Sequence, residues 1–486
     1  INNKLISIED YVNKYCPNLT NSTFYPTIWL LGGHLQTFWA AFVGDNSKDR
    51  VKYEREILTA ADGGTISIDW TPRLNELFSD ESPILIVSHG LTGGSHETYV
   101  HDLLYEALFH EVPAHKRPDL ENFENHPLTA KFRCVVVNFR GCANTKLTSP
   151  LLYCGAYTDD LRLVVKHIHA KFPKAKLCGV GFSLGANIMT KYVGEEGVNC
   201  LFSAFVSVAN PYDLISGALA MHRTWIGRNI YSAKMNANLK RVLYTHKQIL
   251  ESNKYDIDAI AKSKTITDFD AALTSIAFDY LNVTDYYRKA SSNAYINHIR
   301  VPTLLLTAFD DPVAHFETIP WYEVNHNGYV VLGVTKGGGH IGWFSGGNMF
   351  LSYLGPLIGY VKKEMNMKGA PQRWFTKSVV EFVNGIVNGV DESQFNKEES
   401  KTQDSKVKNP YTSQKLEFLP SPMSSTSSRI KRHLVDNDQL SHKKLKKSDN
   451  EENKKNLMDL EKEIISSNDF DLDNKENNNK KNLKLV

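Results

Sequence analysis

A serine with the context of a nucleophile lies in the segment GVGFSLGAN, where Ser183 stands between Gly181 and Gly185. The residues before it are apolar and typical of a buried strand, and the residues after it follow a helical pattern. A serine on the sharp turn between such elements projects its hydroxyl from the strand end, and the flanking glycines leave room for the close packing of that turn. The context predicts a catalytic serine rather than a small residue in an ordinary turn.

The acid and the base that would activate this serine follow it in the order expected for such a site. The apolar strand in VPTLLLTAFDDPV ends at Asp310 and Asp311. We select Asp311 because it directly precedes Pro312, and we keep Asp310 as the alternative. His340 follows the glycine run of TKGGGHIGWF, a loop that can bring an imidazole over the serine. We expect His340 to take the proton of Ser183, and Asp311 to fix the imidazole tautomer.

Backbone N–H groups near the serine are candidates for an oxyanion hole, which would stabilise the negatively charged oxygen of a reacting ester. One donor is the N–H of Leu184, the residue after the serine. The strand in ILIVSHGLTGGSHE runs into a loop whose Leu91 N–H is the second candidate. We interpret His89, at the start of that loop, as a structural residue.

Composition limits the classes of protein to which the chain can belong. Of its 486 residues, 42% are apolar and the formal net charge is +2, so the chain can bury a large core and has no general reason to bind nucleic acid. The cysteines have no metal-ligand spacing, and we expect reduced thiols in an intracellular, cytoplasmic protein. They are Cys16, Cys134, Cys142, Cys154, Cys178 and Cys200. We expect neither a metal nor another cofactor.

Short β-branched runs alternate with helical patterns over the first 394 residues. The predicted strands are 65–70, 84–88, 133–138, 176–181, 203–208, 303–308 and 328–334, and the predicted helices include 97–109, 157–171, 184–194 and 346–364. Such alternation indicates an α/β fold with a mainly parallel central sheet and helices on both faces. The alternation is interrupted between Pro211 and Ile299, where only helical patterns occur, and this indicates a helical cap inserted between two strands.

The expected organisation has five parts. They are an N-terminal extension packing on the core (1–50), the first part of the core (51–210), the helical cap insertion (211–299), the second part of the core (300–394) and a disordered C-terminal tail (395–486). The tail is rich in Asn, Lys, Ser, Asp and Glu and has too few apolar residues to form a core. Its segment KRHLVDNDQLSHKKLKK matches a nuclear-import pattern, but we favour a solvated charged tail.

The sequence also bears on membrane association and targeting. No apolar run reaches the roughly 18 to 20 residues that a membrane-spanning helix needs. The chain begins at Ile1 and not at methionine, which leaves open whether a targeting segment precedes it. The apolar segment 28–42, IWLLGGHLQTFWAAF, has two interpretations: contact with a membrane or lipid droplet, or packing beneath the cap as part of an acyl pocket. We favour the second.

Six segments together resemble the AB-hydrolase-4 family of α/β-hydrolases, which includes bacterial YheT-like hydrolases, animal lipases and yeast medium-chain ethyl ester synthase/esterases. They are GGHLQTFWAAF (32–42), HGLTGGSHE (89–97), NFRGCANTKLTSP (138–150), GFSLGAN (181–187), DFDAALTSIAFDYLNVTDYYRKASS (268–292) and TAFDDPV (307–313). The resemblance covers roughly residues 20–370, is strongest to fungal esterases and monoacylglycerol lipases, and excludes the tail. It implies an α/β-hydrolase fold with Ser183, Asp311 and His340 as the catalytic residues.

The implied function is hydrolysis of short- and medium-chain fatty acyl esters such as monoacylglycerol through an acyl-enzyme. The alternative is transfer of the acyl group from acyl-CoA to ethanol, which shares that intermediate. A small-molecule ester is thus the expected partner, with peripheral association to a lipid droplet or membrane surface. Arg140 and the pair Tyr286-Tyr287 are candidates for substrate binding, but we favour an ion-paired loop anchor and cap packing.

Overall fold

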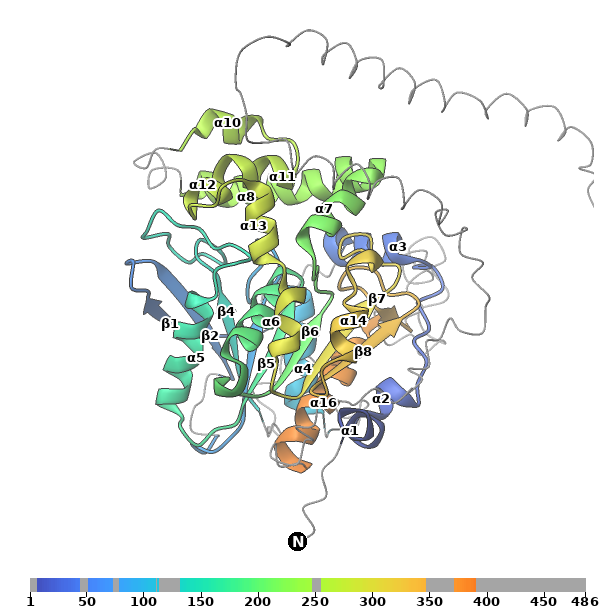
Figure 1. Cartoon of the computed structure of the whole chain (residues 1–486). Helices are drawn as coiled ribbons and strands as arrows, with labels where there is room; N and C mark the ends of the chain where they lie inside the picture. Colours follow the sequence, from blue (N-terminus) through green and yellow to red (C-terminus); the bar gives the residue numbers. More distant parts are fainter. Residues whose placement is uncertain are drawn as a thin grey trace, which may run out of the picture. The chain divides into compact units, whose positions relative to one another are not determined.

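The computed structural model describes residues 7–43, 51–72, 78–110, 112, 132–246, 255–346 and 371–389 (Figure 1). The chain divides into two compact units, Ile1–Gln403 and Asp404–Val486, and every described residue belongs to the first. The tail predicted for 395–486 and nearly all of the helix predicted over 346–364 lie outside the described residues.

The central feature is an eight-stranded sheet with the order β1-β2-β4-β3-β5-β6-β7-β8. Its strands are β1 (Glu54–Thr59), β2 (Thr65–Thr71), β3 (Ile84–Ser88), β4 (Arg133–Asn138), β5 (Leu177–Phe182), β6 (Phe202–Val208), β7 (Thr303–Ala308) and β8 (Val330–Thr335). Strand β2 pairs antiparallel with β1 and β4, and all other neighbours are parallel. The sheet is mainly parallel, as predicted, and the sequence missed only β1, whose side chains are largely exposed at the sheet edge.

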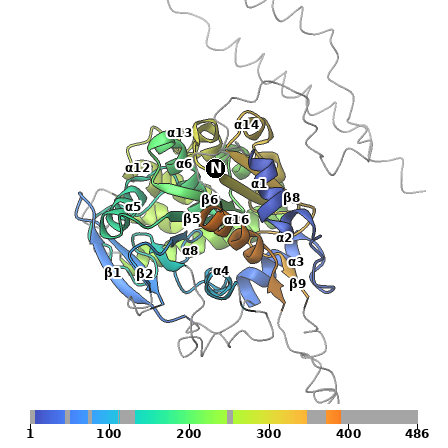
Figure 2. The ribbon, with the colours of Figure 1, turned by 90° about the horizontal axis from the view of Figure 1, so that it is seen from below.

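Helices cover both faces of this sheet. Helices α1 (Ile8–Tyr15), α4 (Thr98–Phe109) and α16 (Phe375–Gly389) pack on one face, and α5 (Asp159–Lys171) and α6 (Leu184–Glu196) pack on the other. Figure 2 shows α5 and α6 on the opposite side of the sheet from α4 and α16. Because both faces are covered, every residue of β3, β4, β5, β6 and β7 is buried, which explains why their sequences are mostly apolar and do not alternate.

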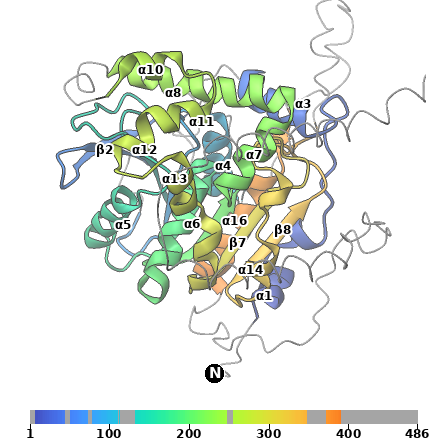
Figure 3. The same cartoon turned by 45° about the horizontal axis from the view of Figure 1, so that its top comes forward.

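A group of helices connects β6 to β7 and lies over one end of the sheet (Figures 1 and 3). It comprises α7 (Leu214–Arg223), α8 (Ala233–Thr245), α10 (Ile257–Lys262), α11 (Ile266–Phe269), α12 (Ser275–Ala277) and α13 (Val283–Ala290). A separate small apolar core that includes Leu239, Leu243 and Phe269 holds part of it together. The change from strand to helix after β6 accords with the cap expected at 211–299, whose boundaries stay a prediction.

The remaining described elements are short. They are α2 (Pro17–Thr20), α3 (Gly33–Phe38), α14 (Trp321–Asn325), a two-stranded sheet of β9 (Phe344–Ser345) and β10 (Gln372–Arg373), and several short 3-10 and π-helical segments. None of the six cysteines, all of which lie within the described ranges, forms a disulfide. Within the described ranges, no helix is long and apolar enough to cross a membrane.

Candidate active site

Ser183 occupies the tight turn between β5 and α6 that the sequence predicts. Its backbone has φ 51° and ψ −119°, a strained conformation for a residue with a side chain, and its N–H donates to the Val208 carbonyl at 3.0 Å. A Cβ at Gly181 would clash with the Ala186 backbone, and one at Gly185 would clash with the His89 carbonyl. The two glycines therefore permit the close packing that keeps the serine on this turn.

His340 lies between Ser183 and Asp311. Its Nε2 is 2.9 Å from Ser183 Oγ, and its Nδ1 is 2.8 Å from Asp311 Oδ2. The other carboxylate oxygen of Asp311 accepts hydrogen bonds from the N–H groups of Val313 and Ala314, both at 2.8 Å. Because an ionised carboxylate only accepts, it favours the imidazole tautomer with the proton on Nδ1, and Nε2 is then free to accept the serine proton.

Asp310, the alternative acid, has a different position. Its Oδ1 accepts a hydrogen bond from the Gly339 N–H at 2.9 Å, so it holds the loop that carries His340 and does not contact the imidazole itself in the described structure. Burial raises the pKa of this carboxyl above its ordinary value. The two adjacent aspartates thus contact different parts of one loop.

Helix α3, in the N-terminal segment, also supports this loop, and sequence reasoning missed this role. The Thr37 hydroxyl accepts a hydrogen bond from the His340 N–H at 2.9 Å, and Gln36 Oε1 accepts one from the Phe344 N–H at 2.7 Å. A Cβ on Gly33 would clash with the Asp310 carbonyl, which explains a glycine there. The motif GGHLQTF was the only sign of this role in the sequence. The expectation that segment 28–42 lines an acyl pocket is wrong, because none of its residues lines the pocket at Ser183.

The loop after β3 is fixed on both sides of Leu91. The Gly90 N–H donates to the Tyr99 hydroxyl at 2.9 Å, and the Thr92 N–H donates to the Tyr153 hydroxyl at 2.7 Å. Leu91 and Leu184 both line the same pocket as Ser183, and Leu184 is the first residue of α6, where backbone N–H groups lack partners within the helix. These two residues are thus in the region where oxyanion donors were expected.

His89 is a structural residue, as predicted. It is fully buried, with Nδ1 2.7 Å from the Gly90 carbonyl oxygen, and its Nε2 accepts a hydrogen bond from the Phe139 N–H at 3.3 Å. Burial lowers its pKa to about 4, so the imidazole is neutral at ordinary pH. Arg140 is likewise a buried loop anchor, with hydrogen bonds to Asp62 and Asp160.

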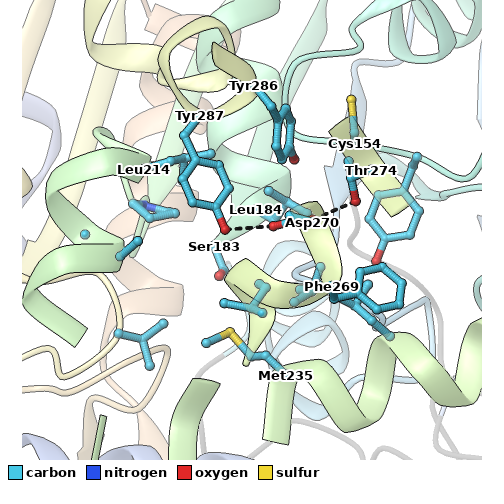
Figure 4. A pocket seen from close by; sticks show the side chains of 18 of the residues that line it. Cys154, Ser183, Leu184, Leu214, Met235, Phe269, Asp270, Thr274, Tyr286 and Tyr287 are labelled. Atoms are coloured by element: carbon cyan, nitrogen blue, oxygen red, sulfur yellow. Dashed lines mark hydrogen bonds between the residues drawn. The ribbon is translucent and has the colours of Figure 1, made fainter. Parts of the chain in front are cut away.

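Ser183 opens onto a pocket of about 940 Å³, including its mouth, between the sheet and the connecting helices (Figure 4). Most of its lining is apolar, with leucines from the core loops and Met221, Met235, Leu239 and Phe269 from the helices above. Tyr286 and Tyr287 also line it, so they belong to the pocket wall as well as to the packing of α13. A pocket of this kind suits an aliphatic chain beside a reactive hydroxyl.

No group of three or more His, Cys, Asp or Glu side chains in the described ranges is arranged to hold a metal ion.

Comparison with known proteins gives a consistent result. A family model for the α/β hydrolase fold matches residues 83–342. Monoacylglycerol lipase of Saccharomyces cerevisiae is 33% identical over 417 residues, covering 76% of this chain and 87% of that protein. Medium-chain fatty acid ethyl ester synthase/esterase 2 of the same yeast is 27% identical, covering 78% and 90%. Embryogenesis-associated protein EMB8 of Picea glauca is 35% identical, and the chain spans 65% of its length.

Proposed function

Because the chain belongs to the α/β-hydrolase fold family, we propose that it is a serine carboxylic-ester hydrolase acting on short- and medium-chain fatty acyl esters such as monoacylglycerol. The family and fold predicted from the sequence are confirmed by the family match and the mainly parallel sheet. The observation that most strongly supports the activity is the hydrogen-bonded chain from Ser183 through His340 to Asp311 beside an apolar pocket.

In the proposed reaction, Ser183 Oγ attacks the ester carbonyl carbon while His340 Nε2 takes its proton. The 2.9 Å distance between these atoms is within the range for such a transfer. The tetrahedral intermediate then collapses, and the leaving alcohol takes the proton back from His340. Water repeats the sequence on the acyl-enzyme, releasing the fatty acid and restoring Ser183.

Asp311 acts on the imidazole and not on the ester. Its carboxylate stabilises the positive charge that His340 carries while it holds the serine proton. The two backbone N–H groups that bond its other oxygen keep the carboxylate oriented. The N–H groups of Leu91 and Leu184 are the proposed donors to the oxyanion, where fixed donors are expected to contribute strongly to the rate.

The apolar pocket is the proposed site of the acyl chain. Its methionines and leucines contact aliphatic carbon without leaving polar groups unpaired. The yeast relative named monoacylglycerol lipase supports an acylglycerol as substrate. The proposed mechanism uses only side chains and backbone N–H groups of the protein, so it requires no cofactor.

Acyl transfer is the second candidate, favoured by the relative named as an ethyl ester synthase/esterase. In this reaction Ser183 attacks acyl-CoA, the thioester C–S bond breaks and the leaving CoA thiol takes the proton back from His340. Ethanol in place of water then attacks the acyl-enzyme, with His340 again moving the proton. Incubation with octanoyl-CoA and ethanol followed by product analysis tests it. Ethyl octanoate is the product expected from transfer, whereas octanoic acid alone at high ethanol contradicts this candidate.

Peripheral association with a lipid surface is proposed from a group of exposed apolar side chains. Ile28 is 81% exposed, Trp225 72% and Leu219 65%. Ile28 precedes α3, and the other two lie on α7 or just after it. Helices α3 and α7 lie near each other (Figures 1 and 3), and His34 of α3 is 2.9 Å from the hydroxyl of Tyr231 in the π-helical segment Gly227–Ser232 that follows α7. We expect Trp225→Ser to weaken flotation with phosphatidylcholine vesicles while leaving turnover of a soluble butyrate ester unchanged.

A serine-to-alanine substitution tests the proposed hydrolase directly. We expect Ser183→Ala to abolish turnover of p-nitrophenyl octanoate and labelling by a fluorophosphonate, because among the described residues no other hydroxyl is bonded to the imidazole of His340. An unchanged melting temperature serves as the control for folding. Labelling that persists in the variant means that another residue is the nucleophile and that the proposed mechanism is wrong.

A further inference from the structure

Asp270 is a buried carboxyl in the wall of the pocket that holds Ser183. It is 6% exposed and belongs to the helical segment between β6 and β7. The Tyr287 hydroxyl donates to its Oδ2 at 2.8 Å, and the Thr274 hydroxyl donates to its Oδ1 at 2.6 Å (Figure 4). Among the described residues no Lys, Arg or His forms an ion pair with it. Two hydroxyl groups alone therefore offset its charge.

This arrangement is costly for a residue with only a structural role. Burial raises the pKa of Asp270 to about 6, although both hydroxyl groups act in the opposite direction. A neutral amide in the same place could join Thr274 to Tyr287 without removing a charge from water. The residue also begins a π-helical turn, η7 (Asp270–Thr274), and such turns are frequent at functional sites.

The carboxylate has hydrogen-bonding capacity beyond its two partners. Its two oxygens offer about four acceptor positions, and Tyr287 and Thr274 use two of them. Asp270 lines the same pocket as Ser183, so a molecule bound at the serine lies in the cavity that this carboxylate borders. An aliphatic chain has no donor to offer it, but a hydroxyl group does.

We propose that Asp270, oriented by Tyr287 and Thr274, accepts a hydrogen bond from a free hydroxyl group of the substrate. The enzyme then prefers esters that carry such a hydroxyl over esters of the same shape that lack it, because the latter leave a buried carboxylate facing apolar atoms. The inference rests on the proposed ester hydrolysis. The hydroxyl belongs either to the alcohol part, as in monoacylglycerol, or to the acyl chain, and the chemistry of recognition is the same.

Two pairs of esters test this preference and distinguish its source. On the alcohol side, kcat/KM is compared for monooctanoylglycerol and propyl octanoate. On the acyl side, it is compared for ethyl hydroxyoctanoate, with the hydroxyl at the chain end, and ethyl octanoate. We expect the hydroxyl-bearing ester to be preferred by about 10- to 150-fold in one pair, the range for a hydrogen bond to a charged group. Ratios near one in both pairs overturn the proposal.

Variants then assign the preference to this carboxyl. We expect Asp270→Asn to reduce the preferred ratio to within about threefold of one, mainly through slower turnover of the hydroxyl-bearing ester. Asp268→Asn is the matched control, since Asp268 lies on the same helical segment, caps α11 and is not part of the pocket wall. A ratio that is unchanged in Asp270→Asn assigns the residue a structural role and overturns the proposal.

Other outcomes are also decisive. If Asp270→Asn does not fold, as judged by lost fluorophosphonate labelling, the ratios of the natural protein and of Tyr287→Phe, which removes one of the two donors, decide the question. If all four esters are hydrolysed without preference, the hydroxyl subsite is contradicted but the proposed hydrolase activity is not. Absence of any turnover that depends on Ser183 contradicts the proposed hydrolase together with this inference.

Discussion

The hydroxyl of Thr37 offers a test of whether α3 positions the catalytic base. Thr37 is 4% exposed, and its Oγ1 donates to the Gly33 carbonyl at 2.6 Å while accepting from the His340 N–H at 2.9 Å. Thr37→Val preserves the volume of the side chain but removes both hydrogen bonds. The imidazole then loses a fixed backbone position next to Ser183, although no group that touches the substrate has changed.

The size of the effect can be estimated from the hydrogen bond that is lost. A buried N–H left without a partner costs about 1 to 3 kcal/mol. At about 1.4 kcal/mol for each factor of ten, this corresponds to a fall in kcat of about 5- to 150-fold. We expect KM to change little, because Thr37 does not line the pocket at Ser183.

The assay is p-nitrophenyl octanoate turnover, with the rate of fluorophosphonate labelling as a second measure of serine activation. Thr37→Ser keeps the hydroxyl and should restore most of the activity. Thr20→Val is the matched control, since among the described residues the Thr20 hydroxyl bonds only to the carbonyl of Cys16, the residue before α2, at 3.3 Å. If Thr37→Val folds normally and retains kcat within about twofold, the position of His340 does not depend on α3.

Two further predictions concern stability. Arg140 is fully buried between Asp62 and Asp160, so Arg140→Met leaves uncompensated carboxylates and should lower the free energy of unfolding, measured in urea, by about 3 to 5 kcal/mol. The control is the same change at the part-exposed Arg162, which should cost about 1 kcal/mol or less for each ion pair lost. Equal losses of unfolding free energy in the two variants would contradict this prediction. Burial raises the pKa of Asp270 from 3.8 to about 6, so the folded state binds a proton more tightly than the unfolded state. Relative to Asp270→Asn, the natural protein should be most stable below about pH 4 and should lose up to about 3 kcal/mol as the pH rises to 7; a pH-independent difference would exclude this titration.

Much of the fold could be predicted because its signals are local. The strands β2–β8 are short runs rich in apolar residues, and a strand covered on both faces of its sheet must be mostly apolar whatever packs against it. Strand β1 gave no such signal, because an edge strand exposes much of its surface. Ser183 could be recognised for a similar reason, since its strained turn requires a strand, two glycines and a helix within a few residues.

The order of Ser183, the aspartate pair and His340 along the chain was also determined by the sequence. The choice between Asp310 and Asp311 rested on a motif alone, because the two adjacent aspartates follow the same apolar strand and have nearly the same neighbours in the sequence. Only the tertiary structure shows that the second contacts the imidazole and the first contacts the Gly339 N–H. Side-chain direction at a strand end depends on the loop that follows, and no local pattern encodes it.

Contacts between distant segments could not be predicted from the sequence. Thr37 bonds to a residue 303 positions away, and Asp270 meets the pocket from a helix far along the chain from Ser183. Hydrophobic periodicity shows which face of an element is buried, but it does not show which other element covers that face. The sequence therefore determined the elements and the chemistry of the serine, whereas their packing in three dimensions decided what supports the histidine and which polar groups border the pocket.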